Sequence, residues 1–207
     1  MKVSMRKIAF HKSRGDLRVC SLDGIQTCSF VDPRKEAAQW VDHYRGQIER
    51  SHALVVLGLG SGFHIESLLE NFDGPIFVLE KHKDFISEFR TTTVSENKKC
   101  NRVHISLLED FDGNFIPKEY FKDLSVLVFA PTAYLDLEDY KPFFDLFQGR
   151  SKESVERQFS LRGVDHFFLP ETFKPESPGK EYQRLAKEQA LTMRWQQVFK
   201  MIGELIK

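Results

Sequence analysis

The sequence has no long hydrophobic run and no excess of charge of either sign. Its longest apolar stretch, residues 53–59, includes a glycine and is far shorter than the roughly 20 residues that a membrane-spanning helix needs. Residues 1–7 resemble neither an apolar signal segment nor a cleavage site of small residues. Thirty Lys and Arg residues balance thirty Asp and Glu residues, which leaves no general attraction for nucleic acid or anionic lipid. These absences predict a cytoplasmic protein that binds neither nucleic acid nor a membrane.

Cysteine is scarce, and neither cysteine nor histidine follows a metal-binding pattern. The three cysteines include no CxxC pair and the seven histidines show no HxxxH spacing, so we expect no metal. Cys20 and Cys28 lie on either side of Asp23-Gly24, a favoured two-residue hairpin turn. Because side chains alternate along a strand, such a hairpin would direct the two thiols to opposite faces of its sheet. We therefore expect no disulfide between them.

Hydrophobic residues make up 41% of the chain, enough for a folded core, and their pattern alternates between strand and helix. Residues 17–30 place β-forming residues on both sides of the Asp-Gly turn and predict a β-hairpin. Asp32 and Pro33 are a favoured N-cap and first residue of a helix. The later elements follow in turn, with buried strands expected at 53–60, 75–80, 102–110 and 124–131, and helices at 63–72, 83–92 and 137–147. This order predicts an α/β fold, a Rossmann-like three-layer sandwich with a mostly parallel sheet.

The pattern divides the chain into three parts. Residues 1–50 are expected to form an N-terminal β-hairpin and helix, residues 51–150 the Rossmann-like core, and residues 151–207 a C-terminal helical extension. Residues 170–179 contain three prolines and a glycine, which is typical of an exposed linker. Beyond this linker, apolar residues fall on one face of a predicted amphipathic helix: Tyr182, Leu185, Leu191, Trp195, Val198, Phe199, Ile202 and Leu205. That face would pack on the protein's own sheet, or bind a second subunit or another protein.

The segment GLGSGFH, residues 58–64, connects the first buried strand to the next helix. Its glycines allow a sharp turn and let a ligand approach the backbone, and the helix that follows would present free N–H groups. The next strand ends at Glu80, where nucleotide and S-adenosylmethionine sites hold an acid that binds the ribose hydroxyls. His64, neutral in the first helical turn, would donate a hydrogen bond to a phosphate or carboxylate. The predicted ligand-binding residues are Gly58, Gly60, Ser61, Gly62, His64, Glu80 and Asp110.

The spacing of the glycines favours one ligand class over another. The NAD fingerprint GxGxxG requires a small residue where this chain has Phe63. GxGxG instead resembles the loop of S-adenosylmethionine-dependent methyltransferases, and Asp110 follows the third strand where that family places an acid near adenine. Two features depart from the methyltransferase pattern. Val56 stands where an acid is usual, and APTAY, residues 130–134, matches the Asn/Asp-Pro-Pro-Tyr motif only distantly.

Four segments suggest a second resemblance, and they occur in the order 32–41, 55–70, 77–85 and 131–144. Together they resemble the N-terminal domain of the bacterial motility-associated factor (Maf) proteins, a family associated with glycosylation of flagellin by nonulosonic acids. The resemblance implies a Rossmann-like domain with a GxGxGYH loop, which GLGSGFH matches with Phe63 in place of Tyr. In that family the transferase chemistry is associated with a following domain that carries a Gly-Pro-Ser-Leu-type motif. This chain contains no such motif.

Three functions are compatible with these patterns. The first is a nucleotide- or adenosyl-binding module that resembles the Maf N-terminal domain, without the catalytic domain. The second is an S-adenosylmethionine-dependent methyltransferase, with the glycine loop around the methionine moiety, Glu80 on the ribose and Asp110 near adenine. The third is a non-catalytic interaction domain whose C-terminal helix contacts a protein partner or a second copy of the chain. No catalytic residue is identified; an enzyme of this kind would transfer a methyl or a glycosyl group.

Overall fold

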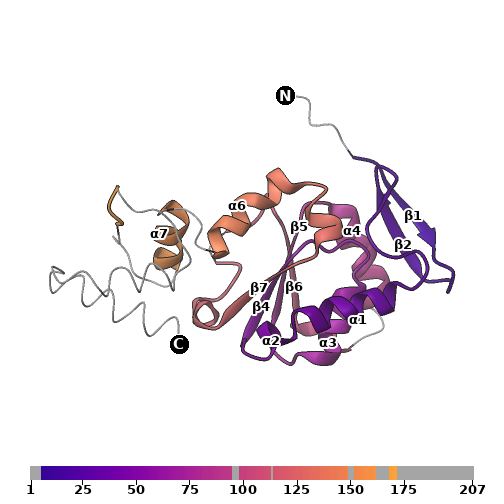
Figure 1. Cartoon of the computed structure of the whole chain (residues 1–207), viewed down its shortest axis with the longest axis horizontal. Coiled ribbons are helices and arrows are strands. Elements are labelled where there is room, and N and C mark those ends of the chain that lie inside the picture. The colour runs from indigo at the N-terminus through magenta and orange to yellow at the C-terminus, as the bar shows by residue number, and fades with distance from the viewer. Residues whose placement is uncertain (1–5, 95–97, 113, 149–151, 162–167, 172–207) are drawn as a thin grey trace. The chain divides into compact units, whose positions relative to one another are not determined.

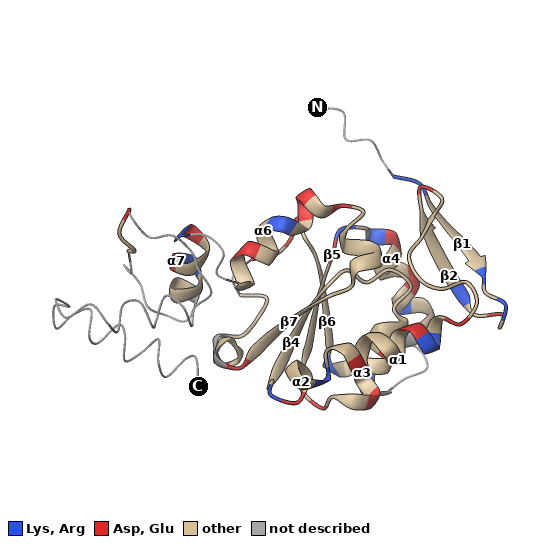
Figure 2. Cartoon of the chain, viewed as in Figure 1, with Lys and Arg blue, Asp and Glu red and all other residues tan. Residues whose placement is uncertain are grey.

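A computed structural model of the chain describes residues 6–94, 98–112, 114–148, 152–161 and 168–171 (Figure 1). The chain forms two compact units, the first ending at Tyr140 and the second beginning at Lys141. Within the described residues, no helix is both long enough and apolar enough to cross a membrane. Figure 2 shows acidic and basic residues interspersed over the first unit, in keeping with the balanced charge of the sequence.

A small antiparallel sheet opens the first unit. It consists of β1 (Ile8–Lys12), β2 (Arg18–Leu22) and β3 (Ile25–Gln26) in the order β1-β2-β3. Leu22 pairs with Ile25, so Asp23 and Gly24 form the predicted two-residue turn, with φ angles of 52° and 81°. Both values lie in the left-handed region that this type of hairpin turn requires. The predicted N-terminal hairpin is therefore confirmed.

The main sheet is parallel and has the order β6-β5-β4-β7. Its strands are β4 (Ala53–Leu57), β5 (Ile76–Glu80), β6 (Val103–Leu107) and β7 (Leu124–Val128). β4 and β5 are buried along their whole length, which explains their continuous runs of apolar residues. The chain moves outward from β4 to β6 and then returns to the other side of β4 as β7. The strand order thus reverses beside β4, and ligands of open α/β sheets bind at the carboxyl ends of strands next to such a reversal.

Helices cover one face of this sheet and form the main core with it. They are α1 (Pro33–His43), α2 (Arg45–Ile48), α3 (Phe63–Asn71) and α4 (Lys83–Phe89), and α1 lies beside α3 (Figure 1). Asp32 caps α1 as predicted, its carboxylate accepting a hydrogen bond from Lys35 N at 3.0 Å. On the opposite face, Phe77 packs against Phe115 and Tyr120 in the segment before β7. The α/β Rossmann-like architecture predicted from the sequence is confirmed.

Short elements complete the first unit, and two helices follow. A π-helical turn spans Arg90–Val94, 3-10 turns span Lys98–Arg102 and Lys118–Lys122, and α5 spans Ala130–Ala133. α6 (Leu137–Gln148) crosses the boundary between the units, and α7 (Lys152–Leu161) belongs to the second. In the second unit, Glu156 accepts a hydrogen bond from Leu169 N at 2.7 Å. The predicted linker beyond Glu171 and the predicted C-terminal helix lie outside the described residues.

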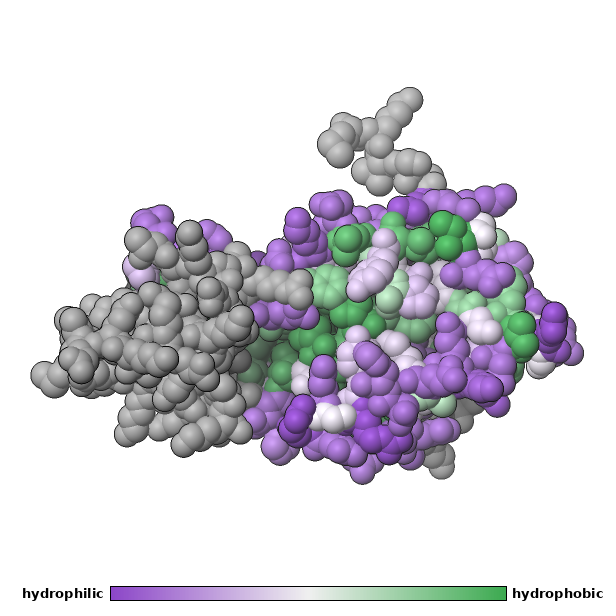
Figure 3. Space-filling model, in the orientation of Figure 1, coloured by the Kyte–Doolittle hydropathy of each residue, from purple (hydrophilic) through white to green (hydrophobic). Residues whose placement is uncertain are grey.

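Large apolar side chains also reach the surface of the first unit. Figure 3 shows hydrophobic residues in patches between hydrophilic ones on the visible face. The exposed large hydrophobic residues described in this unit are Phe10, Ile25, Val31, Tyr134 and Leu137.

Candidate functional site

The glycine loop follows β4 at the carboxyl edge of the main sheet. Gly58, Gly60 and Gly62 all have positive φ angles, of 94°, 51° and 81°. Glycine adopts this conformation most readily because it has no Cβ, so the three glycines let the chain turn sharply from β4 into α3. α3 then begins at Phe63, with Gly62 as its N-cap. The strand–glycine loop–helix unit predicted from the sequence is therefore present.

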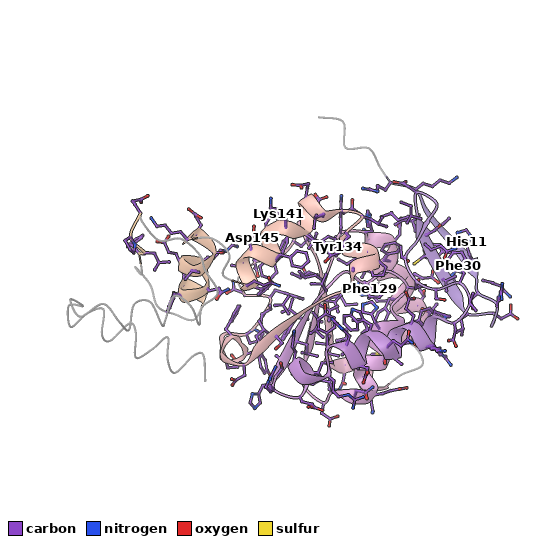
Figure 4. All side chains as sticks on the ribbon, viewed as in Figure 1. His11, Phe30, Phe129, Tyr134, Lys141 and Asp145 are labelled. Carbon is purple, nitrogen blue, oxygen red and sulfur yellow. The ribbon has the colours of Figure 1, made fainter. Side chains whose placement is uncertain are left out.

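The protein's own residues approach each of these glycines. A Cβ atom built on Gly60 would lie 2.7 Å from Thr132 Oγ1, and one on Gly62 would lie 2.4 Å from Phe89 Cδ2. A Cβ atom on Gly58 would lie 3.2 Å from the carbonyl oxygen of Phe129, a residue inside the fold at the end of β7 (Figure 4). Glycine is thus needed at 60 and 62 because α5 and α4 pack directly against the loop.

Glu80 ends β5 and points at the glycine loop. It has no solvent exposure, and its Oε2 accepts hydrogen bonds from Leu59 N at 2.6 Å and Gly60 N at 3.4 Å. Its Oε1 accepts hydrogen bonds from His82 N at 2.8 Å and from the Tyr140 hydroxyl at 3.2 Å. The carboxylate therefore joins the loop to the start of α6 and has a donor on each oxygen.

Burial raises the pKa of both Glu80 and Tyr140. Burial raises the pKa of Glu80, although the hydrogen bonds from Leu59 and His82 favour the charged form. Burial and the nearby Glu80 carboxylate raise the pKa of Tyr140 well above its usual value. Tyr140 consequently keeps its proton and donates a hydrogen bond to Glu80, while its oxygen accepts a hydrogen bond from Lys81 N at 3.1 Å.

A charged network surrounds Asp136 beside this pair. The buried Asp136 carboxylate contacts Lys81 Nζ at 2.7 Å, His82 Nε2 at 2.8 Å and Arg6 Nε at 3.0 Å. Burial alone would raise the pKa of Asp136, but the hydrogen bonds and charges of Lys81 and His82 hold it below its usual value. Asp136 therefore stays ionised and links the N-terminal segment, the end of β5 and the turn before α6.

His64 lies under the loop rather than on its surface. It is 1% exposed, stacks on Phe129 with 3.8 Å between the ring centroids, and its Nε2 lies 3.1 Å from Gly58 O. Burial lowers the pKa of His64 to about 3, so the ring is neutral and Nε2–H donates to that carbonyl. His64 Nδ1 and Thr132 Oγ1 are buried and have no hydrogen-bond partner among the described residues. Two unpaired polar atoms thus flank the glycine loop.

Ser61 joins the loop to the N-terminal hairpin. Its Oγ accepts a hydrogen bond from Cys20 N at 3.0 Å and lies 2.9 Å from Cys20 Sγ and 3.2 Å from Cys28 Sγ. Cys20 belongs to the main core cluster and Cys28 packs with Val19 in a separate one, as expected for side chains on opposite faces of the hairpin, yet both sulfurs reach the same serine. β3 ends at Gln26, so Cys28 lies beyond the strand and its sulfur can turn toward Ser61. None of the three cysteines, which all lie in the described part of the chain, forms a disulfide.

The remaining predicted site residue, Asp110, is exposed in the turn after β6. That turn starts beside the end of β5, because Leu108 N donates a hydrogen bond to Glu80 O at 2.9 Å. A narrow gap with no room for a water molecule adjoins the glycine loop on the side of α1, lined by Cys28, Glu36, Ser61 and His64 among others. In the described part of the chain, no group of three or more His, Cys, Asp or Glu side chains is placed to hold a metal ion.

Sequence reasoning missed the residues that surround Glu80. Lys81 and His82 follow it directly, and such polar residues after a buried strand are a usable signal. Asp136 and Tyr140 gave no signal, because they lie more than fifty residues further along the chain.

No protein-family model and no curated protein matches this chain. Among solved structures, spermidine synthase from Thermotoga maritima aligns with a TM-score of 0.42 and 14% identity, over 63% of this chain and 46% of its own. A spermidine synthase in complex with the transition-state analogue AdoDATO aligns with a TM-score of 0.44 and 14% identity, over 77% of this chain and 61% of its own. DesVI from Streptomyces venezuelae aligns with a TM-score of 0.34 and 18% identity, over 69% of this chain and 54% of its own. This chain therefore spans less than two thirds of each of these proteins.

Proposed function

We propose that the chain is a methyltransferase-like Rossmann module that binds an adenosyl ligand, such as S-adenosylmethionine, at the carboxyl edge of its main sheet. The observation that carries the proposal is Glu80, the last residue of β5, whose carboxylate lies against the glycine loop. A carboxylate in this position binds ribose hydroxyls in Rossmann-like sites.

The hydroxyl of Tyr140 supports this assignment. It donates a hydrogen bond to Glu80 Oε1, as a ribose hydroxyl would. A bound ribose would take the place of Tyr140, and Glu80 would exchange one hydroxyl donor for another without losing a hydrogen bond. Thr132, which packs against Gly60, would also have to move for a ligand to reach the loop. We therefore interpret this arrangement as a closed form of the site.

The other predicted residues have subsidiary roles in this proposal. The loop from Gly58 to Gly62, with Ser61, would adjoin the methionine moiety, and Asp110 would lie near adenine. His64 supports the loop from below through Gly58 O, and Nδ1 would accept a hydrogen bond from a ligand that displaced its neighbours. The Maf resemblance would make this module a companion of a glycosyltransferase domain.

A second function is favoured by a specific observation. Both oxygens of Glu80 already have donors, and α4 and α5 already fill the space beside the glycines. A loop satisfied in this way would serve equally as the rigid centre of a non-catalytic interaction domain. The two functions differ in whether a nucleoside binds.

Calorimetry of the full chain with S-adenosylhomocysteine separates them. We expect micromolar binding, which Glu80→Gln weakens by about 1.5–3 kcal/mol because a hydrogen bond to a charged group is lost. Tyr140→Phe removes the competing hydroxyl and should tighten binding. Tyr134→Phe is the control, because Tyr134 is 63% exposed and should leave affinity unchanged. Absence of binding to S-adenosylhomocysteine, NAD, CMP and UDP-sugars would favour the interaction domain.

A further inference from the structure

Two cysteine sulfurs meet at one serine oxygen between the N-terminal hairpin and the glycine loop. Ser61 Oγ lies 2.9 Å from Cys20 Sγ and 3.2 Å from Cys28 Sγ. Both sulfurs therefore contact a single hydroxyl, although Cys20 lies in β2 and Cys28 follows β3. Cys100, the third cysteine, is buried elsewhere, at the 3-10 turn Lys98–Arg102.

The end of the hairpin brings these sulfurs together. Cys20 is in β2 and faces Thr27, whose N–H donates to Cys20 O at 3.2 Å. The chain leaves the ladder after Thr27, and the Cys28 sulfur reaches Ser61, as the Cys20 sulfur does. Thr27 lies opposite Cys20, where paired Cα atoms are about 5 Å apart, and Cys28 follows it directly, so the Cα atoms of the two cysteines lie near the range of about 4.4–6.8 Å that a disulfide spans. Both sulfurs would have to rotate away from Ser61 to form the bond.

We propose that Cys20 and Cys28 are a redox-active pair that forms a reversible disulfide with hydrogen peroxide as the oxidant. This goes beyond the proposed function, because it needs no nucleoside ligand. Cys28 is the residue attacked first, since it is 6% exposed whereas Cys20 is 1% exposed. The oxidant is peroxide because a bulky disulfide could not reach a thiol with so little exposure.

The reaction proceeds in two balanced steps. The Cys28 thiolate attacks one peroxide oxygen, the O–O bond breaks, and Cys28 becomes a sulfenic acid while hydroxide leaves and takes up the thiol proton as water. The Cys20 sulfur then attacks Cys28 Sγ, the S–O bond breaks, and a second water leaves with the Cys20 proton. Two thiols lose two electrons and peroxide gains them. A dithiol such as dithiothreitol reverses the change.

Three carboxylates and burial make the reaction slow at neutral pH. Burial raises the pKa of Cys28 to about 11, and Glu36 of α1 adds to the effect. Burial likewise raises the pKa of Cys20, with Glu80 of β5 and Glu88 of α4 adding to it, while hydrogen bonds from Ser61 and Thr27 oppose it. Because the thiolate is the nucleophile, the oxidation rate should rise about tenfold per pH unit up to about pH 11.

The disulfide would change how the hairpin is attached to the glycine loop. In the reduced form both thiols contact Ser61, in the middle of that loop. Oxidation moves both sulfurs onto each other and leaves Ser61 with the Cys20 N–H alone. The pair therefore couples the redox state to the contact between the hairpin and the loop.

Peptide mass spectrometry tests the proposal, because residues 19–34 form one tryptic peptide that contains both cysteines and no methionine. After peroxide treatment of the full chain and alkylation, we expect this peptide unalkylated and lighter by two hydrogen atoms, with Cys100 still alkylated. Dithiothreitol should restore double alkylation. Cys100→Ser is the matched control and should behave like the wild type, whereas Cys20→Ser should stop at oxygen adducts on Cys28.

Three results would overturn the proposal. They are a fully alkylated peptide at peroxide concentrations that oxidise methionine residues of the same sample, sulfinic acid on Cys28 in the wild type without a disulfide, or a bridge that involves Cys100. If Cys20→Ser fails to fold, Cys28→Ser replaces it, and oxidation of Cys20 to a stable adduct is then expected. Binding of S-adenosylhomocysteine has no part in any of these readouts.

Discussion

At the scale of single residues, the glycine loop depends on positions where no side chain could be accommodated. Gly62 combines a φ of 81° with a ring of Phe89 that lies 2.4 Å from where a Cβ would be. Phe89 is 1% exposed and belongs to the main core, so it has no free space to move into. Gly62 is therefore constrained both by its own backbone conformation and by the ring of Phe89.

We therefore predict that Gly62→Ala lowers the free energy of unfolding by about 2–4 kcal/mol, from the left-handed backbone and from overpacking against Phe89. Gly46→Ala is the matched control. Gly46 lies in α2 with no atom near its absent Cβ, so alanine there should stabilise by up to about 1 kcal/mol. Urea unfolding of both variants measures the difference, and equal midpoints would contradict the packing of α4 on the loop.

Glu80 shows what could be predicted at this scale and what could not. Its place at the end of a buried strand followed from the run of apolar residues before it and from the glycine loop eighteen to twenty-two positions earlier. Its partners did not, because Tyr140 reaches it from sixty residues away. Local patterns locate a functional group, whereas the groups that satisfy it come from packing between distant segments.

At the scale of elements, a buried carboxylate holds three segments together. Asp136 binds Arg6 before β1, Lys81 and His82 after β5, and itself precedes α6. The arrangement of these three segments at the carboxyl edge of the sheet therefore depends on charge as well as on hydrophobic packing.

Asp136→Asn should lower the free energy of unfolding by about 2–3 kcal/mol at neutral pH. The loss is smaller than for a fully buried pair, because the side chains of Arg6 and Lys81 are 31% and 30% exposed. The folded pKa of Asp136 is depressed, so its contribution is present above the unfolded pKa and disappears as the pH falls through the folded pKa. The wild-type and variant stabilities should accordingly converge below about pH 4.

An exposed ion pair provides the control for this measurement. Asp42 binds Arg45 within one helical turn, and both side chains are about two thirds exposed, at 66% and 68%. Asp42→Asn should change stability by less than about 0.5 kcal/mol at any pH. A difference for Asp136→Asn that is equally small, or that persists unchanged at low pH, would show that the network does not stabilise the fold.

The observed ends of helices and strands match the predicted ones where a glycine, proline or capping residue marks them, and differ by a few residues elsewhere. The expected strand at 53–60 ends at Leu57, because Gly58 turns away with a φ of 94°. The expected helix at 83–92 gives way after Phe89 to a π-helical turn, for which the pattern of apolar residues contained no signal. Pro142 lies inside α6, although proline disfavours a helix interior. The helical periodicity of the neighbouring residues predicted this helix correctly.

At the scale of the whole molecule, the sequence predicts more than the structure describes. The first unit contains the hairpin, the parallel sheet and the glycine loop. The segment from Tyr182 to the end is predicted to be amphipathic, with eight apolar residues on one face. A face of this size is stable in water only if something covers it, whether the same chain or another.

We predict that this face joins two copies of the chain, so that deleting residues 181–207 reduces the solution mass measured by light scattering from two chains to one. A large apolar side chain at the centre of a helical contact is sensitive to charge, because burying a carboxylate without a partner is costly. Trp195→Glu should therefore also give single chains, whereas Gln196→Glu, one position off the apolar face, should leave the dimer intact. A wild-type protein that is already a single chain would instead mean that the helix packs on its own protein, and Trp195→Glu would then lower the unfolding midpoint without changing the mass.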